Sequence, residues 1–197
     1  MGATNHSGYL KAGGVIAGAR VRPLDVERDA RGSFTEIFYD SWDTGIDPSQ
    51  WSVVRSARGV LRGMHLHRRH DEYFLVISGR ASVGLKDLRP GSPTESVSSL
   101  YELDGDHPAC LSFPRGILHG WYFHQETIHI QAVSETYSAY GGDDNLGCHW
   151  SDPALGIPWP EQPKLVAERA ASFPPLAVLL AQTARLAAPD EPWYRGA

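Results

Sequence analysis

The chain has 197 residues, of which 42% are hydrophobic, and this is enough to bury the core of one large domain. Such a composition excludes a mainly disordered protein. Lys and Arg number 18 against 23 Asp and Glu, so the formal net charge is −5. This balance excludes the broad basic surface of a general nucleic-acid-binding protein.

The start of the chain contains no basic run ahead of an apolar stretch and no myristoylation motif, so neither export nor lipidation is expected. The two cysteines, Cys110 and Cys148, are too few and too far apart for a disulfide framework or a zinc ribbon. Residues 176–188 are apolar but include Gln182 and Arg185 and are too few to cross a bilayer. We therefore expect a soluble cytoplasmic protein with reduced thiols and no membrane partner.

Glycine and proline punctuate many short runs rich in Val, Ile, Phe, Tyr and Trp, a pattern typical of an all-β protein. In chain order, the predicted strands are 14–20, 33–38, 52–56, 60–67, 72–78, 81–88, 95–103, 109–113, 120–124 and 127–134, with a tight turn at 78–80. Helical periodicity occurs only near the end, at 164–171 and 175–187. Many short antiparallel strands without a long linker predict one sandwich or jelly-roll domain.

The segment between Gly59 and Gly79 contains the strongest candidates for a metal site. Residues two apart in a strand face the same side, so His65 and His67 present adjacent imidazoles. The charged segment 68–71 indicates a turn, after which Glu72 opens the returning strand and can face this pair.

His119 can add a third imidazole from a neighbouring strand. Any one histidine alone would more simply be a hydrogen-bonded or exposed side chain. Together, His65, His67, Glu72 and His119 form a donor set suited to one divalent ion such as Fe, Mn, Ni, Co or Zn.

This spacing resembles the cupin signature. The first half is complete, at Gly59, His65, His67, Glu72 and Gly79. The second half keeps Pro114, Gly116 and His119, but has Pro108 and Phe123 where glycine and asparagine are usual. The resemblance implies a single all-β cupin domain: a jelly-roll barrel of antiparallel strands with short C-terminal helices and a site in the barrel mouth. We expect an N-terminal strand region at 1–50, the barrel core at 51–160 and the helices at 161–197.

A closer resemblance extends from Asp29 to Pro160. Five blocks carry it: DARGSFTE (29–36), GVLRGMH (59–65), DLRPGSPT (87–94), PRGILHG (114–120) and WSDPALGIPWP (150–160). They look like those of the dTDP-4-dehydrorhamnose 3,5-epimerases, which act on dTDP-4-keto-6-deoxyglucose in deoxysugar biosynthesis. The resemblance implies a nucleotide-sugar substrate, proton abstraction next to a ketone, no metal cofactor, and a homodimer in which Arg31 could reach the partner's site.

The resemblance also implies roles for individual residues. His65 matches the general base and Asp152 the residue that orients it, because a carboxylate can fix the tautomer of an imidazole that titrates near neutral pH. Substrate binding is assigned to Arg31, Glu36, Arg62 and His119; arginine suits a diphosphate because its guanidinium donates in a bidentate fork. Two alternatives remain open: a simple Asp-Pro turn at Asp152, and a surface ion pair between Arg31 and Glu36.

Two positions depart from the family pattern. Glu72 stands where the epimerases usually have a lysine, and Gln131 lies near the expected position of the tyrosine acid. Tyr137 is then the candidate acid. A nitrogen of His65 that binds a metal cannot also act as the base, and other possible proton carriers are His67, His70, His129, Tyr73, Tyr122 and Tyr137.

Three hypotheses follow. The first is an epimerase or isomerase acting on a dTDP-4-keto-6-deoxyhexose. The second is a metal-dependent cupin oxygenase, lyase or isomerase that acts on another substrate. The third is a non-catalytic cupin that binds nucleotide sugars.

Overall fold

The computed structural model describes residues 5–140 and 144–186, and most of the regular elements are short strands. The strands are β1 (Leu10–Gly13), β2 (Arg20–Pro23), β3 (Glu27–Asp29), β4 (Gly32–Phe34), β5 (Gln50–Ser56), β6 (Val60–Leu66), β7 (Glu72–Ser78), β8 (Arg80–Asp87), β9 (Ser98–Asp104), β10 (Ala109–Phe113), β11 (Ile117–Phe123), β12 (Thr127–Val133), β13 (Leu146–Gly147) and β14 (Leu165–Val166). The helices are α1 (Tyr137–Tyr140), the 3-10 turn η1 (Pro153–Leu155), α2 (Glu168–Ala171) and α3 (Leu176–Leu186). In the described part of the chain, no helix has the length and apolar character needed to span a membrane.

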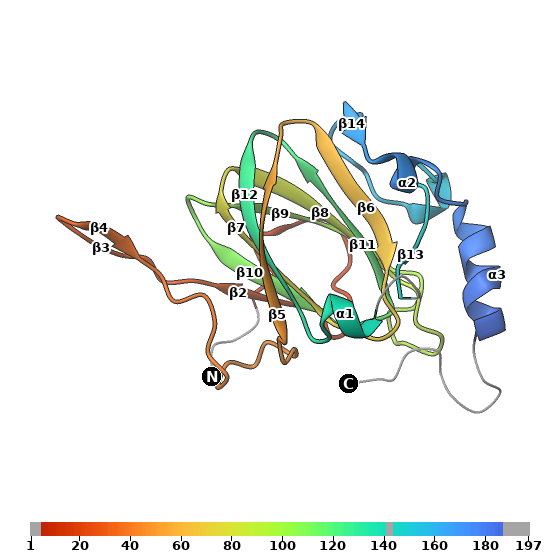
Figure 1. Cartoon of the computed structure of the whole chain (residues 1–197), viewed down its shortest axis with the longest axis horizontal. Coiled ribbons are helices and arrows are strands. Elements are labelled where there is room, and N and C mark those ends of the chain that lie inside the picture. Colours follow the sequence, from red (N-terminus) through yellow and green to blue (C-terminus); the bar gives the residue numbers. More distant parts are fainter. Residues whose placement is uncertain (1–4, 141–143, 187–197) are drawn as a thin grey trace.

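Two sheets face each other, and a small hairpin projects from one side of them (Figure 1). One sheet has the order β1-β9-β8-β11-β6-β13, with β14 also paired to β6; the other has the order β2-β10-β7-β12-β5. The pairs are antiparallel except for β14 with β6. The prediction of an all-β fold with antiparallel strands and short C-terminal helices is confirmed. The described strands form two facing sheets rather than one closed barrel, because their hydrogen-bonded ladders do not continue from one sheet into the other.

Most predicted strands agree with the structure, but the strand predicted at 14–20 is wrong. That segment is a loop between β1 and β2, because Gly13 and Gly18 adopt φ values of 80° and 81° and turn the chain. The segment is apolar because the loop packs on the core and buries Ile16 completely, not because it forms a strand.

Three other predicted elements are shorter than expected. The strand predicted at 33–38 ends with β4 at Phe34. The helix predicted at 164–171 is reduced to α2, because Leu165 and Val166 pair with β6 as β14. The helix predicted at 175–187 is α3, and position 187 lies outside the described residues.

Alternate side chains along the strands point into the space between the sheets and fill it. On β7, Phe74 and Val76 point inward, and on β11, Trp121 and Phe123 do the same. These side chains form the main core with apolar residues of β8, β9 and β10. The same inward positions carry polar side chains toward one end of β7, β11 and β12, and those side chains form the site.

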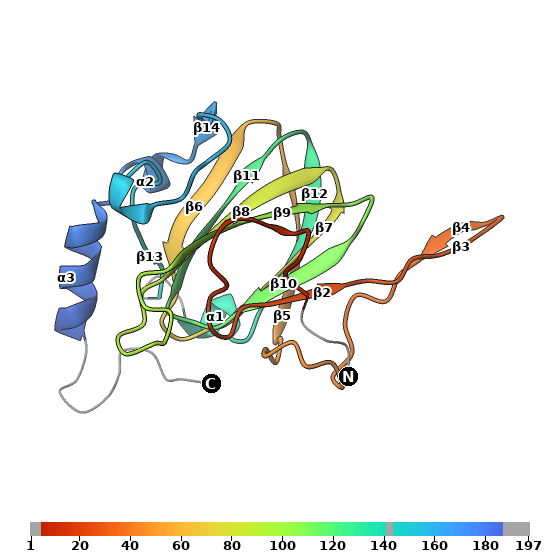
Figure 2. The ribbon, with the colours of Figure 1, turned by 180° about the vertical axis from the view of Figure 1, so that it is seen from behind.

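Chain segments outside the sheets cover both outer faces. Met64 and Leu66 of β6 pack outward against Leu155 of η1 and Leu176 and Leu179 of α3. Figure 2 shows these C-terminal elements beside β6 and β13, opposite the hairpin. On the other sheet, the outward residues of β7 and β10 are covered by Ile37, Phe38, Trp42 and Ile46 of the loop between β4 and β5. The packing of η1 and α3 against β6 fixes the C-terminal segment next to the strand that carries His65.

Candidate active site

A hollow of about 300 Å³ lies between the two sheets, where β6, β7, β11 and β12 come together with the chain around α1, β13 and α2. Its walls are formed by Arg62, Gly63, His65, His67, Glu72, His119, Trp121, Gln131, Tyr140, Asn145, Ala167, Arg169 and Ala170. It therefore contains every predicted metal ligand.

Three donor atoms converge at the floor of this hollow. Glu72 Oε1 lies 3.5 Å from His67 Nε2 and 3.9 Å from His119 Nε2. The three atoms lie within 4.8 Å of one another. All three side chains are buried, and Glu72 Oε1 and His119 Nε2 have no hydrogen-bond partner. We call His67, Glu72 and His119 the floor triad.

Each member of the floor triad is held from behind. His67 donates from Nδ1 to the carbonyl of Asp144 at 2.6 Å, and His119 donates from Nδ1 to the carbonyl of Ile117 at 3.0 Å. Glu72 accepts at Oε2 a hydrogen bond of 2.9 Å from the amide of Gln131. Because the Nδ1 atoms carry the protons, both Nε2 atoms keep a lone pair that faces Glu72 Oε1.

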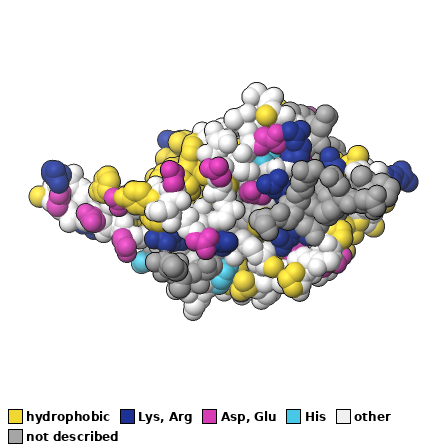
Figure 3. Space-filling model, turned by 90° about the horizontal axis from the view of Figure 1, so that it is seen from below, with side chains coloured by type: hydrophobic (Ala, Val, Ile, Leu, Met, Phe, Trp, Pro, Cys, Tyr) yellow, Lys and Arg dark blue, Asp and Glu magenta, His cyan; other side chains and the backbone are white. Residues whose placement is uncertain are grey.

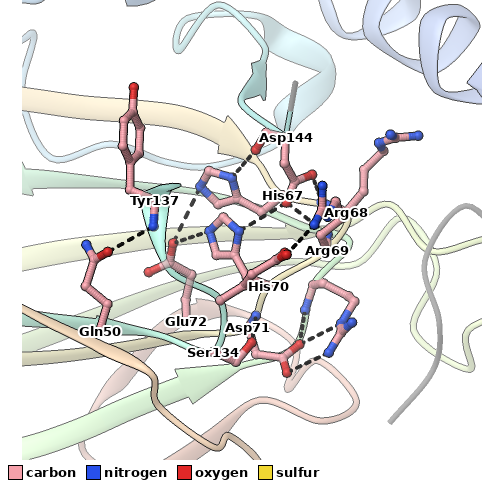
Figure 4. Close-up of polar contacts among 12 residues, drawn as sticks. Gln50, His67, Arg68, Arg69, His70, Asp71, Glu72, Ser134, Tyr137 and Asp144 are labelled. Carbon is pink, nitrogen blue, oxygen red and sulfur yellow. Dashed lines mark hydrogen bonds and ion pairs between the residues drawn. The ribbon is translucent and has the colours of Figure 1, made fainter. Parts of the chain in front are cut away.

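His70 lies behind the floor triad, between two buried carboxylates (Figure 4). Its Nδ1 is 3.1 Å from Asp144 Oδ2, and its Nε2 is 3.4 Å from Glu72 Oε1. Burial alone would lower the pKa of His70, but Asp144 and Glu72 outweigh it and raise the pKa to about 9. Burial likewise opposes ionisation of Glu72, yet the imidazoles, His70 first, lower its pKa to about 2. His70 is thus a cation at the back of the site.

His65 lines the hollow but stands apart from the floor triad. Its ring centroid is 6.3 Å from those of both His67 and His119, and it is absent from the group of converging atoms. Burial lowers the pKa of His65 to about 3, and His119 and His67 lower it as well. The ring therefore stays neutral and keeps a lone pair for a bound molecule.

The residue expected to orient His65 is elsewhere. Asp152 accepts hydrogen bonds from the backbone of Ala154 at 2.9 Å and of Leu176 at 2.7 Å, so it caps η1 and the start of α3. His65 Nδ1 has no hydrogen-bond partner. The predicted contact between Asp152 and His65 is wrong, because an Asp-Pro sequence that begins a turn uses its carboxylate on nearby backbone amides. Among the charged residues of the hollow, Arg169 lowers the pKa of His65 further and Glu72 raises it.

Tyr137 does not line the hollow. Its side chain is exposed and points away from Glu72 and His70, and its backbone amide donates to Gln50 (Figure 4). Tyr140, one turn later on α1, reaches the hollow and stacks on His70 with ring centroids 4.2 Å apart. The tyrosine that lines the hollow is therefore Tyr140, whereas the Tyr137 ring packs on the outer side of Tyr140, with ring centroids 5.4 Å apart, and is 58% exposed.

The predicted substrate-binding residues are divided between two places. Arg62 and His119 line the hollow, and Arg62 is held by Ser56 Oγ at 2.9 Å. Arg31 lies in the turn of the β3–β4 hairpin, where it pairs with Asp29 and is almost fully exposed. Glu36 follows that hairpin and does not line the hollow. Figure 3 shows the hairpin as a protrusion with charges of both signs.

Several site residues were not predicted from the sequence. They are Tyr140, Asp144, Asn145 and Arg169. Asp144 lies 74 positions from His70 and belongs to no recognised spacing. In the sequence, nothing distinguishes Arg169 from an ordinary exposed arginine of a short helix. Asn145 precedes β13 and Arg169 follows β14, and both strands pair with β6, so tertiary pairing brings these two residues to the hollow.

A comparison with known families agrees with this fold. A model of the dTDP-4-dehydrorhamnose 3,5-epimerase family matches residues 14–177. The chain belongs to this family. Its relatives include the spore coat polysaccharide biosynthesis protein SpsL of Bacillus subtilis, which is 31% identical over 74% of this chain and 97% of SpsL.

The dTDP-4-dehydrorhamnose 3,5-epimerase of Sinorhizobium fredii is 30% identical, over 77% of this chain and 81% of that enzyme. Among solved structures, the dTDP-6-deoxy-D-glucose-3,5-epimerase of Legionella pneumophila, in complex with dTDP-4-keto-L-rhamnose, superposes with a TM-score of 0.75 at 26% identity. That match covers 85% of this chain and 92% of the Legionella chain. The similarity to this epimerase family therefore includes both the sequence and the arrangement of the two sheets.

Proposed function

We propose that this protein is an epimerase or isomerase of deoxysugar biosynthesis that acts on a dTDP-linked 4-keto-6-deoxyhexose by moving a proton next to the ketone. Family membership supports the substrate class. The observation that carries the proposal is that His65, a neutral imidazole, faces the hollow beside Arg62 without belonging to the floor triad.

In this proposal His65 removes the proton, and the arginines at the hollow bind the diphosphate. A neutral imidazole can accept a proton from carbon next to a ketone, and Arg62 and Arg169 offer guanidinium groups for phosphate oxygens. Neither arginine has a carboxylate partner within the described residues. Tyr140 is the hydroxyl-bearing side chain of the hollow and is our candidate for returning a proton.

We also propose that His67, Glu72 and His119 bind one divalent ion such as Fe, Mn, Ni, Co or Zn. Two observations support the fit: Glu72 Oε1 and His119 Nε2 are buried without partners, and both ligand histidines donate from Nδ1 to a carbonyl. Such second-sphere contacts are usual for metal-bound histidines. When bound, a metal of this class would act as a Lewis acid toward a substrate oxygen. We keep His65 as a fourth, more distant candidate ligand.

The decisive experiment combines metal analysis with proton exchange. The protein is purified without a metal-affinity column, its metal content is measured by inductively coupled plasma mass spectrometry, and solvent deuterium incorporation into dTDP-4-keto-6-deoxyglucose is followed by NMR. We expect about one metal ion per chain, lost in His67→Ala, and exchange that is lost in His65→Ala.

Other outcomes separate the alternatives. A metal-loaded protein that exchanges no deuterium would refute the epimerase proposal and favour a metal-dependent reaction on another substrate. Binding of the nucleotide sugar without exchange and without metal would favour a non-catalytic binding protein. Exchange by a metal-free protein would refute the metal site alone.

We further propose that the active form is a homodimer. The β3–β4 hairpin projects from the two sheets (Figure 1). Arg31 and Phe34 of this hairpin are exposed and do not line the hollow of their own subunit. Trp51 and Val53 of the edge strand β5 are also exposed. A partner subunit placed against this side would bury these side chains and receive Arg31.

A further inference from the structure

The two positions that the sequence analysis predicts to depart from the family pattern are in contact. Glu72 opens β7 and Gln131 lies on β12, and these neighbouring strands pair Glu72 with Val133 and Phe74 with Gln131. Glu72 and Gln131 are therefore diagonal neighbours on the inward face of the sheet. Their side chains meet in a hydrogen bond of 2.9 Å from Gln131 Nε2 to Glu72 Oε2.

This contact leaves the two oxygens of one carboxylate in different situations. Oε2 is satisfied by the Gln131 amide, whereas Oε1 has no hydrogen-bond partner and lies closest to imidazole nitrogens. Glu72 is only 2% exposed, so water cannot easily replace the amide. The Gln131 donor thus fixes the rotation of the carboxylate and leaves Oε1 facing the Nε2 atoms of His70, His67 and His119, at 3.4, 3.5 and 3.9 Å.

The type of residue at position 131 matters for this geometry. An amide nitrogen is a donor without charge, so it can hold an ionised carboxylate and leave the negative charge available to a cation. An apolar side chain would leave Oε2 unpaired in a buried site, which is unfavourable. A second carboxylate would repel Glu72.

We propose that Gln131 is a positioning residue that orients Glu72 as a ligand for the divalent ion, so that Glu72 and Gln131 act as one unit. This inference rests on the metal component of the proposed function. It accounts for the pair of residue types found here, because a glutamate ligand at position 72 needs an uncharged donor at position 131 to hold it.

The test uses Co²⁺, whose visible absorption reports the geometry of its ligands. The full-length protein is stripped with a chelator and titrated with Co²⁺, and the same titration is made with Gln131→Met, Glu72→Gln and the double variant. Methionine has nearly the length of glutamine but cannot donate a hydrogen bond. The matched control is Gln125→Met, the same change at an exposed position in the connection between β11 and β12.

We expect one Co²⁺ per chain in the unaltered protein. Gln131→Met should weaken Co²⁺ binding about 10- to 100-fold and shift the absorption bands, as for other second-sphere changes, while Gln125→Met changes neither. In the Glu72→Gln background, Gln131→Met should have no further effect on Co²⁺ affinity, because there is no carboxylate left to orient.

Two results would overturn the inference alone: Gln131→Met that binds Co²⁺ with unchanged affinity and spectrum, or effects of the two single variants that simply add. If the unaltered protein binds no Co²⁺, the metal component of the proposed function fails and this inference fails with it. Circular dichroism of each variant shows whether the fold is retained, and the comparison uses a folded Gln131→Met protein; if that variant does not fold, Gln131→Leu replaces it.

Discussion

At the residue scale, His129 is a buried polar side chain outside the proposed chemistry. It is 0% exposed and its two ring nitrogens have no hydrogen-bond partner. Its ring stacks on Phe123 and contacts Phe74 in a tilted arrangement. Burial, with a smaller contribution from Arg62, lowers the pKa of His129 to about 4. The folded state is therefore more stable with a neutral His129 ring than with a protonated one.

This predicts a specific dependence of stability on pH. The ordinary pKa of histidine is about 6.5, so the favourable contribution of neutral His129 is complete above that pH and is lost as pH falls toward 4. A shift of this size corresponds to about 3 kcal/mol. Urea unfolding from pH 7 to pH 4 should therefore show a shallower loss of stability in His129→Leu than in the unaltered protein. The exposed His107→Leu serves as control, and parallel profiles for His129→Leu and the unaltered protein would contradict the expectation.

The two arginines of the hollow give a second prediction at this scale. Replacing Arg62 or Arg169 by alanine should raise the Kd for dTDP about tenfold or more, because each removes charge-assisted hydrogen bonds to phosphate oxygens. Isothermal titration calorimetry at two salt concentrations measures the effect. Arg55→Ala is the matched control, since Arg55 pairs with Glu126 and does not line the hollow. Equal losses in all three variants would show only a general effect of net charge.

At the element scale, the close approach of β6 and β11 brings His65 beside His119. These histidines are paired across the ladder, and the register shifts directly after them. Gly63 has φ 126°, and a Cβ there would lie 2.6 Å from Gly120 Cα. Glycine at both positions lets the two strands touch next to the site.

Gly63→Ala should therefore destabilise the protein and spread the two strands. Gly32 is the matched control, because its φ of 135° is similar but a Cβ there would meet nothing within 4 Å. Both substitutions carry the strain of a positive φ, of order 1–3 kcal/mol, and Gly63→Ala adds the steric clash. In urea titrations, Gly63→Ala should lower the free energy of unfolding by at least about 1 kcal/mol more than Gly32→Ala. If the two variants lost equal free energy of unfolding, the contact between β6 and β11 would not depend on glycine at position 63.

At the scale of the whole molecule, the proposed dimer predicts complementation between subunits. Arg31→Ala and His65→Ala proteins should each be inactive in the exchange assay. If Arg31 serves the partner's site, a mixed dimer has one site with both side chains intact, and random mixing should restore about a quarter of the activity. Size-exclusion chromatography with light scattering should show a dimer. A stable monomer, or mixed variants that stay inactive despite subunit exchange, would refute the arrangement.

Sequence spacing located part of the site because the necessary information is local. Two-residue alternation places His65 and His67 on one strand, and the following turn brings Glu72 back beside them. The strand pattern and the cupin-like spacing supplied the fold class, and the second half of that spacing supplied His119. Asp152 was assigned by its match to a family block and Tyr137 by its nearness to Gln131 in the sequence. Neither assignment contained information on where the side chain points, and the structure places both side chains outside the hollow.

The order of residues along the chain was sufficient to predict an all-β member of a nucleotide-sugar epimerase family with a cluster of imidazoles and a carboxylate, because local alternation and motif order carry that information. The folded arrangement was needed to separate His65 from the floor triad, to join Gln131 to Glu72, to pair Asp144 with His70, and to bring Arg169 to the hollow. These contacts depend on the register between strands and on the packing of the C-terminal segment, and no short-range pattern encodes them.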